Sequence, residues 1–146
     1  KDKVTNFNLY DEENINMYLH LDLLEDYLKP YFKAAVGNYK ITMDAKKEFL
    51  NSNLNIKKIS ELMNSHHNYL KNNLKITTPE IDKMIDVSFE NGAIGSKIVG
   101  SGGGGSIVSL STNSNTSNKI VSALKRVGVK DAFIARKGNG PTIYYE

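Results

Sequence analysis

The chain of 146 residues has the composition of one ordinary folded domain, with 40% hydrophobic and 24% charged residues and no cysteine. Its 19 basic and 16 acidic side chains leave a net charge of +3, which is too small and too dispersed for a dedicated nucleic-acid binder. No apolar run approaches the roughly 20 residues that a membrane-spanning helix needs. The absence of cysteine excludes disulfides and thiolate metal sites and fits an intracellular protein. We therefore expect a cytoplasmic protein whose partners include neither nucleic acid nor a membrane.

The N-terminal part is expected to begin with a polar lead-in over residues 1–10, followed by a single domain over residues 11–146. The lead-in lacks both the apolar core of a signal peptide and a starting methionine, which suggests a processed or subcloned fragment. From Asp11 onward, apolar residues recur at every fourth position and predict an amphipathic helix. These residues are Ile15, Leu19, Leu23 and Tyr27. Pro30 is expected to end this helix, because proline cannot continue the backbone hydrogen-bond pattern.

Further helices are expected before residue 92. Helical spacing of apolar residues continues over residues 32–50 and again over residues 55–73. Thr78 followed by Pro79 predicts the start of another helix, since threonine caps the free amides and proline fits the first turn. The Asn-Gly pair at residues 91–92 is expected to end it.

After residue 92 the apolar period changes from about four residues to two, which predicts strands. The expected strands cover residues 94–99, 106–111, 131–136 and 141–145, and a helix through residues 120–127 ends at Gly128. This order predicts an α+β fold with a ferredoxin-like antiparallel sheet, helices packed on one face of that sheet, and additional N-terminal helices.

The loop between the first two expected strands is the strongest candidate for a binding site. Six of the twelve residues from position 95 to position 106 are glycine, whereas a hairpin turn needs one or two. Bare backbone amides can approach an anion closely, as in phosphate-binding loops. The candidate residues are Gly100, Ser101, Gly102, Gly103, Gly104, Gly105 and Ser106. A flexible hairpin or an artificial Gly-Ser linker is the alternative, although the flanking strands favour a site. The residue order differs from that of a Walker loop.

The remaining charged residues give no catalytic or metal-binding pattern. His66 and His67 are neighbours on an expected helix, so their side chains diverge by about 100° and cannot hold one metal ion together. We expect His66 to pack in the core and His67 to be solvated. Lys97 is expected to be a solvated charge, and Asp82 to pair with Lys83 or to face water. No pair of carboxylates suggests general acid–base chemistry.

Three segments in order resemble the GHMP kinase superfamily, which includes galactokinases and mevalonate kinases. The glycine-rich loop with its flanking strands resembles the third motif of that family. The segment Glu61–Leu70 resembles the family's "LM..SH..L" helix, and Ile76–Asp82 resembles its "vS.pelD" helix start. The resemblance covers about residues 35–146, and galactokinase-like and mevalonate-kinase-like members are the most similar.

The resemblance implies that this chain is the C-terminal domain of an ATP-dependent kinase. Such a kinase transfers the γ-phosphoryl group of ATP, with Mg²⁺, to a hydroxyl of a sugar or of a mevalonate-type small molecule. The ATP-phosphate loop and the catalytic residues are then expected in an N-terminal kinase domain that this chain lacks, so the fragment alone is expected to be inactive. The alternative is a non-catalytic ligand-sensing or protein-interaction module with the same fold.

Overall fold

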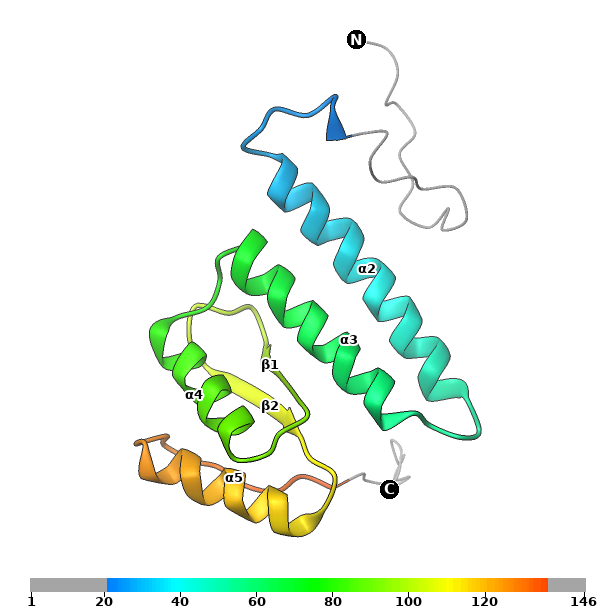
Figure 1. Ribbon diagram of the computed structural model, residues 1–146. Helices are drawn as coiled ribbons and strands as arrows, with labels where there is room; N and C mark the ends of the chain where they lie inside the picture. The colour runs from blue at the N-terminus through cyan, green and yellow to red at the C-terminus, as the bar shows by residue number, and fades with distance from the viewer. Residues whose placement is uncertain (1–20, 137–146) are drawn as a thin grey trace, which may run out of the picture.

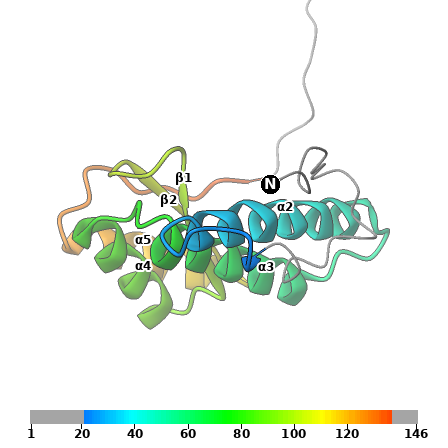
Figure 2. The same ribbon diagram turned by 90° about the horizontal axis from the view of Figure 1, so that it is seen from above.

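The computed structural model describes residues 21–136 and has an α+β architecture, as the sequence predicts (Figure 1). The elements are α2 (Lys29–Leu50), α3 (Ile56–Asn68), the π-helix η1 (Tyr69–Asn73), α4 (Pro79–Glu90), β1 (Gly95–Val99), β2 (Ser106–Leu110) and α5 (Ser114–Arg126). Helices α2 and α3 form an antiparallel pair, and the hairpin of β1 and β2 packs against α3 and α4. Seen from above, the hairpin lies on one side of α4 and α5 (Figure 2). Among the described residues, no helix is long and apolar enough to cross a membrane.

The N-terminal helix predicted up to Pro30 is helical at Leu21 but is wrong over residues 22–28. These residues form turns and irregular structure, and Pro30 lies in the first turn of α2 instead of ending a helix. Proline suits this position, because the first amides of a helix have no partner within the helix. Leu23 and Tyr27 are exposed, so this part of the apolar stripe is not buried. Residues 11–20 of the predicted helix lie outside the described residues.

Helices α3, α4 and α5 each begin after a residue whose side chain caps the helix. Asn55 accepts a hydrogen bond from the amide of Lys58 at the start of α3, and Thr78 accepts one from Ile81 at the start of α4. Asn113 caps α5 in the same way. Each cap satisfies an amide that the helix cannot satisfy internally. The helix predicted over residues 55–73 is confirmed, except that its last turn widens into η1.

The hairpin pairs Gly95 with Leu110 and Val99 with Ser106, which confirms the two strands around the glycine-rich loop. The outer edge of β1 is covered by one side chain of α3. The side-chain Nδ2 atom of Asn64 donates to the Ile94 carbonyl at 3.1 Å, and its Oδ1 atom accepts from the Ser96 amide at 3.0 Å. Asn64 therefore satisfies the backbone of an edge strand as a neighbouring strand would.

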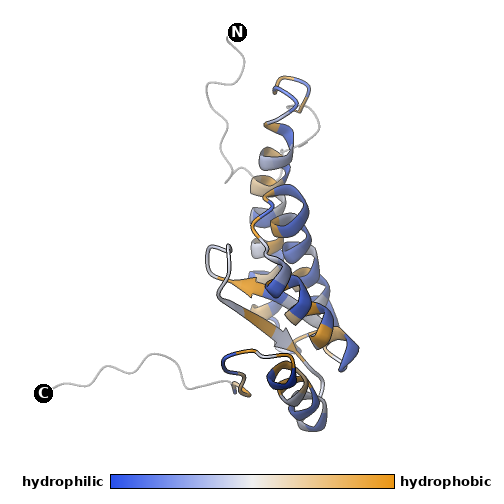
Figure 3. Ribbon diagram, turned by 90° about the vertical axis from the view of Figure 1, so that its left-hand side faces the viewer, coloured by the Kyte–Doolittle hydropathy of each residue, from blue (hydrophilic) through white to orange (hydrophobic). Residues whose placement is uncertain are grey.

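Two small groups of buried residues form the core. Leu70, Ile81, Ile85 and Ile98 join η1, α4 and β1, whereas Ala93, Ile120 and Leu124 join α5 to the start of the hairpin. In Figure 3 the two strands carry hydrophobic stretches, whereas the helices carry both hydrophilic and hydrophobic residues along their length.

The strand predicted over residues 131–136 is not formed. These residues have no regular secondary structure, and Phe133 is 77% exposed. A hollow separates the segment from β2, so its backbone does not reach the strand edge to form a ladder. The last predicted strand, over residues 141–145, lies outside the described residues.

Candidate functional site

The glycine-rich loop has a backbone that requires glycine for conformational reasons. Positive φ angles occur at Gly100, Gly102, Gly103, Gly104 and Gly105 and range from 74° to 136°. Residues with a Cβ atom rarely adopt such angles. A Cβ at Gly103 or Gly104 would meet nothing within 4 Å, so at these positions the backbone angle, and not crowding, calls for glycine.

The loop is anchored to the segment that precedes α4. The Gly103 amide donates a hydrogen bond of 2.7 Å to the carbonyl oxygen of Ile76. A Cβ at Gly102 would lie 2.5 Å from the same oxygen, closer than any real contact. Only glycine at position 102 therefore lets the loop dock at this place. This contact distinguishes the loop from a free Gly-Ser tether.

Four other amides of the loop have no backbone acceptor within the described residues. Within residues 21–136, the amides of Ser101, Gly102, Gly104 and Gly105 donate no hydrogen bond to a backbone carbonyl. Successive amides in turns with positive φ form concavities that attract anions. The loop can therefore offer four backbone donors to an anionic group, whereas the amide of Gly103 is already engaged.

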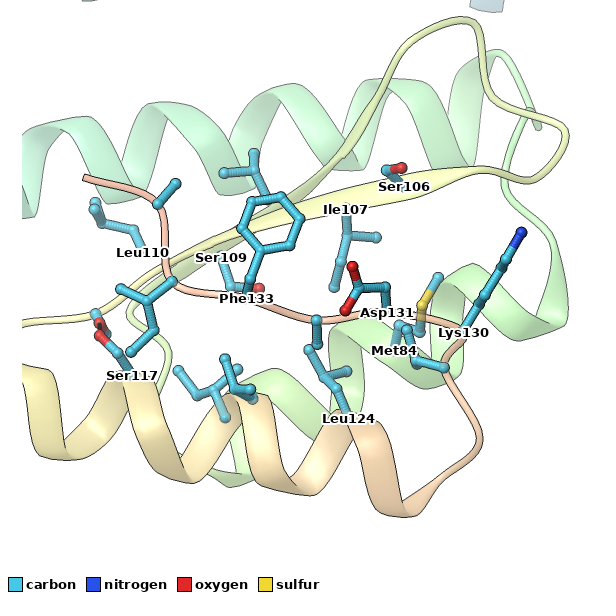
Figure 4. Close-up of a pocket in the computed structure, with 18 of the residues that line it drawn as sticks. Met84, Ser106, Ile107, Ser109, Leu110, Ser117, Leu124, Lys130, Asp131 and Phe133 are labelled. Atoms are coloured by element: carbon cyan, nitrogen blue, oxygen red, sulfur yellow. Dashed lines mark hydrogen bonds between the residues drawn. The ribbon is translucent and has the colours of Figure 1, made fainter. Parts of the chain in front are cut away.

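The C-terminal end of the loop borders a hollow with a volume of about 700 Å³ (Figure 4). Gly105 and Ser106 line this hollow, together with apolar side chains of β2 and α5 such as Ile107 and Leu124. In Figure 4 the segment that carries Lys130, Asp131 and Phe133 runs along the hollow between β2 and α5. The hollow thus combines an apolar floor with a few polar groups, which is typical of a small-molecule site.

His67 is buried, with 6% of its surface exposed, so the prediction that it is solvated is wrong. The reason is that α3 packs between α2 and the hairpin. The charge of Asp82 on α4 also acts on His67. Burial lowers the pKa of His67; Lys71 and Lys97 add to this effect, whereas Asp82 and Asp86 oppose it. Its Nδ1 atom is buried and has no hydrogen-bond partner within the described residues.

Asp82 pairs with a different lysine from the one expected. Its Oδ2 atom lies 3.1 Å from the Nζ atom of Lys71 on η1, so the expected pairing with Lys83 is wrong, while 29% of the Asp82 side chain remains exposed. The second carboxylate oxygen is buried and has no partner in the described part of the chain.

A second, smaller cavity of about 490 Å³ lies between α2 and α3, with His66 and Lys97 among its lining residues. His66 is half-buried, in accord with the packing role expected for it. Lys97 is also half-buried, and its Nζ atom donates to the Ile98 carbonyl at 2.7 Å, so the expectation of a solvated charge is wrong. Burial lowers the pKa of Lys97. Burial also lowers the pKa of His66, and the nearby charges of Lys97 and His67 act in the same direction.

No group of three or more histidine and acidic side chains within residues 21–136 is placed to hold a metal ion. The features that sequence reasoning missed are Asn64 and Ile76, which hold the hairpin and the loop. Neither position carries a local signal, because each acts through backbone groups about 30 residues away along the chain.

Residues 45–130 match the family model described as "GHMP kinases C terminal". The chain belongs to the GHMP kinase family. A galactokinase of Clostridium perfringens is 29% identical over 118 residues, which cover 74% of this chain and 29% of that protein. A galactokinase of Fusobacterium nucleatum is 33% identical over 84 residues, covering 57% of this chain and 20% of the relative. A galactokinase of Bacillus subtilis is 37% identical over 57 residues, which cover 38% of this chain and 15% of that protein. The chain spans less than a third of the length of these curated relatives.

Proposed function

We propose that this chain is the C-terminal part of an ATP-dependent kinase that phosphorylates a hydroxyl of a small sugar. The observation that supports the proposal is the anchored glycine-rich loop, whose amides at positions 101, 102, 104 and 105 donate to no backbone carbonyl within residues 21–136. Membership in the GHMP kinase family supports a kinase over a ligand sensor or a protein-interaction module. An N-terminal domain that supplies the ATP-phosphate loop and the catalytic residues is part of this proposal.

The acceptor that we propose is galactose, because the relatives from C. perfringens, F. nucleatum and B. subtilis are galactokinases. A mevalonate-type acceptor has no comparable support among these proteins. The hollow beside Gly105 and Ser106 offers serine hydroxyls, Lys130 and Asp131 at its edge, groups that can bond the hydroxyls of a sugar.

Phosphoryl transfer depends mainly on positioning and on neutralising negative charge. ATP, bound with Mg²⁺, supplies the phosphoryl group. This chain contributes the backbone amides of the glycine-rich loop, which donate hydrogen bonds to phosphate oxygens. Because most residues of the loop are glycine, few side chains hinder the approach of the phosphate. The hydrogen bond from Gly103 to Ile76 keeps these amides in place before the ligand arrives, which reduces the ordering cost of binding. The proposal assigns Mg²⁺ coordination to the N-terminal domain.

The test joins this chain to the N-terminal part of the C. perfringens galactokinase and measures ADP formation with ATP, Mg²⁺ and galactose. We expect turnover that requires both parts and that is greater with galactose than with mevalonate. A matched variant, Gly104→Val, places a branched side chain at a φ of 136° and is expected to reduce turnover at least tenfold. Gly128→Val provides the control, because Gly128 also has a positive φ but lies after α5.

Binding of galactose without any ADP formation would contradict the proposal and favour a ligand sensor. Greater turnover with mevalonate would retain the kinase but reject galactose as the acceptor. Equal loss of turnover in the Gly104 and Gly128 variants would show that the loop has no special part in the reaction.

A further inference from the structure

The glycine-rich loop rests on a segment whose own backbone is unusual. Lys75 has a φ of 54° and is the only residue other than glycine with a positive φ among residues 21–136. This conformation is unfavourable for a side chain with a Cβ atom and persists only where the surroundings enforce it. Lys75 directly precedes Ile76, whose carbonyl oxygen accepts the hydrogen bond from Gly103.

The helix that leads into this segment is also irregular. Its last turn is the π-helix Tyr69–Asn73, in which the Leu74 amide bonds to the carbonyl of Tyr69. Single π-helical turns are rare and occur frequently at functional sites. The Ile76 amide then bonds back to the carbonyl of Leu70 at 3.2 Å, which turns the chain sharply before α4.

The two ends of this turn are joined by one ion pair. Lys71 lies on η1 and Asp82 in the first turn of α4, and their Nζ and Oδ2 atoms are 3.1 Å apart. The side chain of Asp82 is 29% exposed, and its other oxygen is buried without a partner among the described residues. Lys71 is thus the side chain that holds this carboxylate, and the pair spans the turn with Ile76 near its middle.

We propose that the Lys71–Asp82 ion pair is a positioning device that sets the glycine-rich loop through Ile76. The pair adds to the buried contacts of Leu70, Ile81 and Ile85 that join η1 to α4. It thereby helps to hold Lys75 in its unfavourable conformation and to direct the Ile76 carbonyl at the Gly103 amide. Its part in a kinase rests on the proposed function, whereas its effect on the loop does not. A partly exposed ion pair adds little to overall stability, so its removal acts locally on the loop.

The experiment measures amide hydrogen exchange at Gly103 by NMR in the 146-residue chain without any ligand. Asp82→Asn and Lys71→Met remove the pair, whereas Lys71→Arg retains it. Asp26→Asn is the matched control, because it removes the Asp26–Lys29 pair near the start of α2, far along the chain from the loop. We expect exchange at Gly103 to become about fivefold faster in the first two variants, which is the upper range of what a partly exposed ion pair contributes.

Exchange at Gly103 in Lys71→Arg and Asp26→Asn is expected to stay within about twofold of the original chain. The amides of Ile120 and Leu124 in α5 report on global unfolding, and we expect their exchange to be unchanged in every variant. Unchanged exchange at Gly103 in Lys71→Met would overturn the proposal, even if Asp82→Asn failed to fold. Equal acceleration at Gly103 and in α5 would overturn it too, since the pair would then act on global stability alone. Failure of galactose turnover in the joined enzyme would refute the proposed function but not this positioning role.

Discussion

Substitution of Gly102 by alanine tests whether the loop is held by its contact with Ile76. With the loop docked, the new Cβ lies 2.5 Å from the Ile76 oxygen at a φ of 81°. The backbone angle costs about 1–2 kcal/mol, and the overlap costs about 1–3 kcal/mol more. Releasing the loop costs only the net contribution of the Gly103 hydrogen bond, about 1 kcal/mol. The cheaper response is release, so we expect the loop to leave Ile76 and the free energy of unfolding to fall by about 1–2 kcal/mol.

The matched control is Gly103→Ala, which has a φ of 74° but open space around the new Cβ. It carries only the backbone cost of about 1–2 kcal/mol, and the residue at position 103 keeps its hydrogen bond to Ile76. Urea unfolding measures the two stability losses, which should be similar, while hydrogen exchange at position 103 separates the variants. Fast exchange is expected in Gly102→Ala and slow exchange in Gly103→Ala. Slow exchange in Gly102→Ala would refute the reasoning, because the loop would then tolerate a contact that the geometry forbids.

Three further predictions concern the scaffold. Asn64→Ala leaves the Ile94 carbonyl and the Ser96 amide without partners, so urea unfolding should show a free energy of unfolding lower by about 2–4 kcal/mol. Asn64→Asp should give a smaller loss than Asn64→Ala. Gly37→Ala places a Cβ 2.4 Å from the ring of Tyr69, so thermal unfolding should show a lower Tm although alanine favours helices; an unchanged Tm would contradict the packing. Burial lowers the pKa of both His66 and His67, so unfolded chains bind protons more tightly. The contribution of these histidines to the free energy of unfolding should therefore be fully present above about pH 6.5 and be lost as the pH drops below this value. A double variant with glutamine in place of both His66 and His67 should abolish this loss.

Much of the fold follows from local signals in the sequence. The start of α4 is predicted by Thr78 and Pro79, because capping depends on residues that are adjacent in the chain. The hairpin is predicted by a period of two on both sides of the loop. The segment over residues 131–136 has the same kind of pattern but forms no strand, since a strand also needs a partner within hydrogen-bonding distance.

The candidate site is predicted by its glycine content but not by its contacts. The excess of glycine indicates a backbone with unusual angles, and the structure has five such angles in the loop. The anchor at Ile76 and the pair of Lys71 with Asp82 join residues that are distant in sequence or on different elements. The burial of His67 likewise depends on how α3 packs between its neighbours. Such contacts are set by tertiary packing, which helical periodicity does not encode.

The most direct test of the central claim is an NMR titration of the 146-residue chain with tripolyphosphate. We expect the amide resonances of Ser101, Gly102, Gly104 and Gly105 to shift, because these amides donate to no backbone carbonyl within residues 21–136 and can donate to phosphate oxygens. Gly128, which has a positive φ of 88° after α5, should not shift. Unshifted loop amides at millimolar tripolyphosphate, or equal shifts at Gly128, would contradict the claim that this loop is a phosphate site.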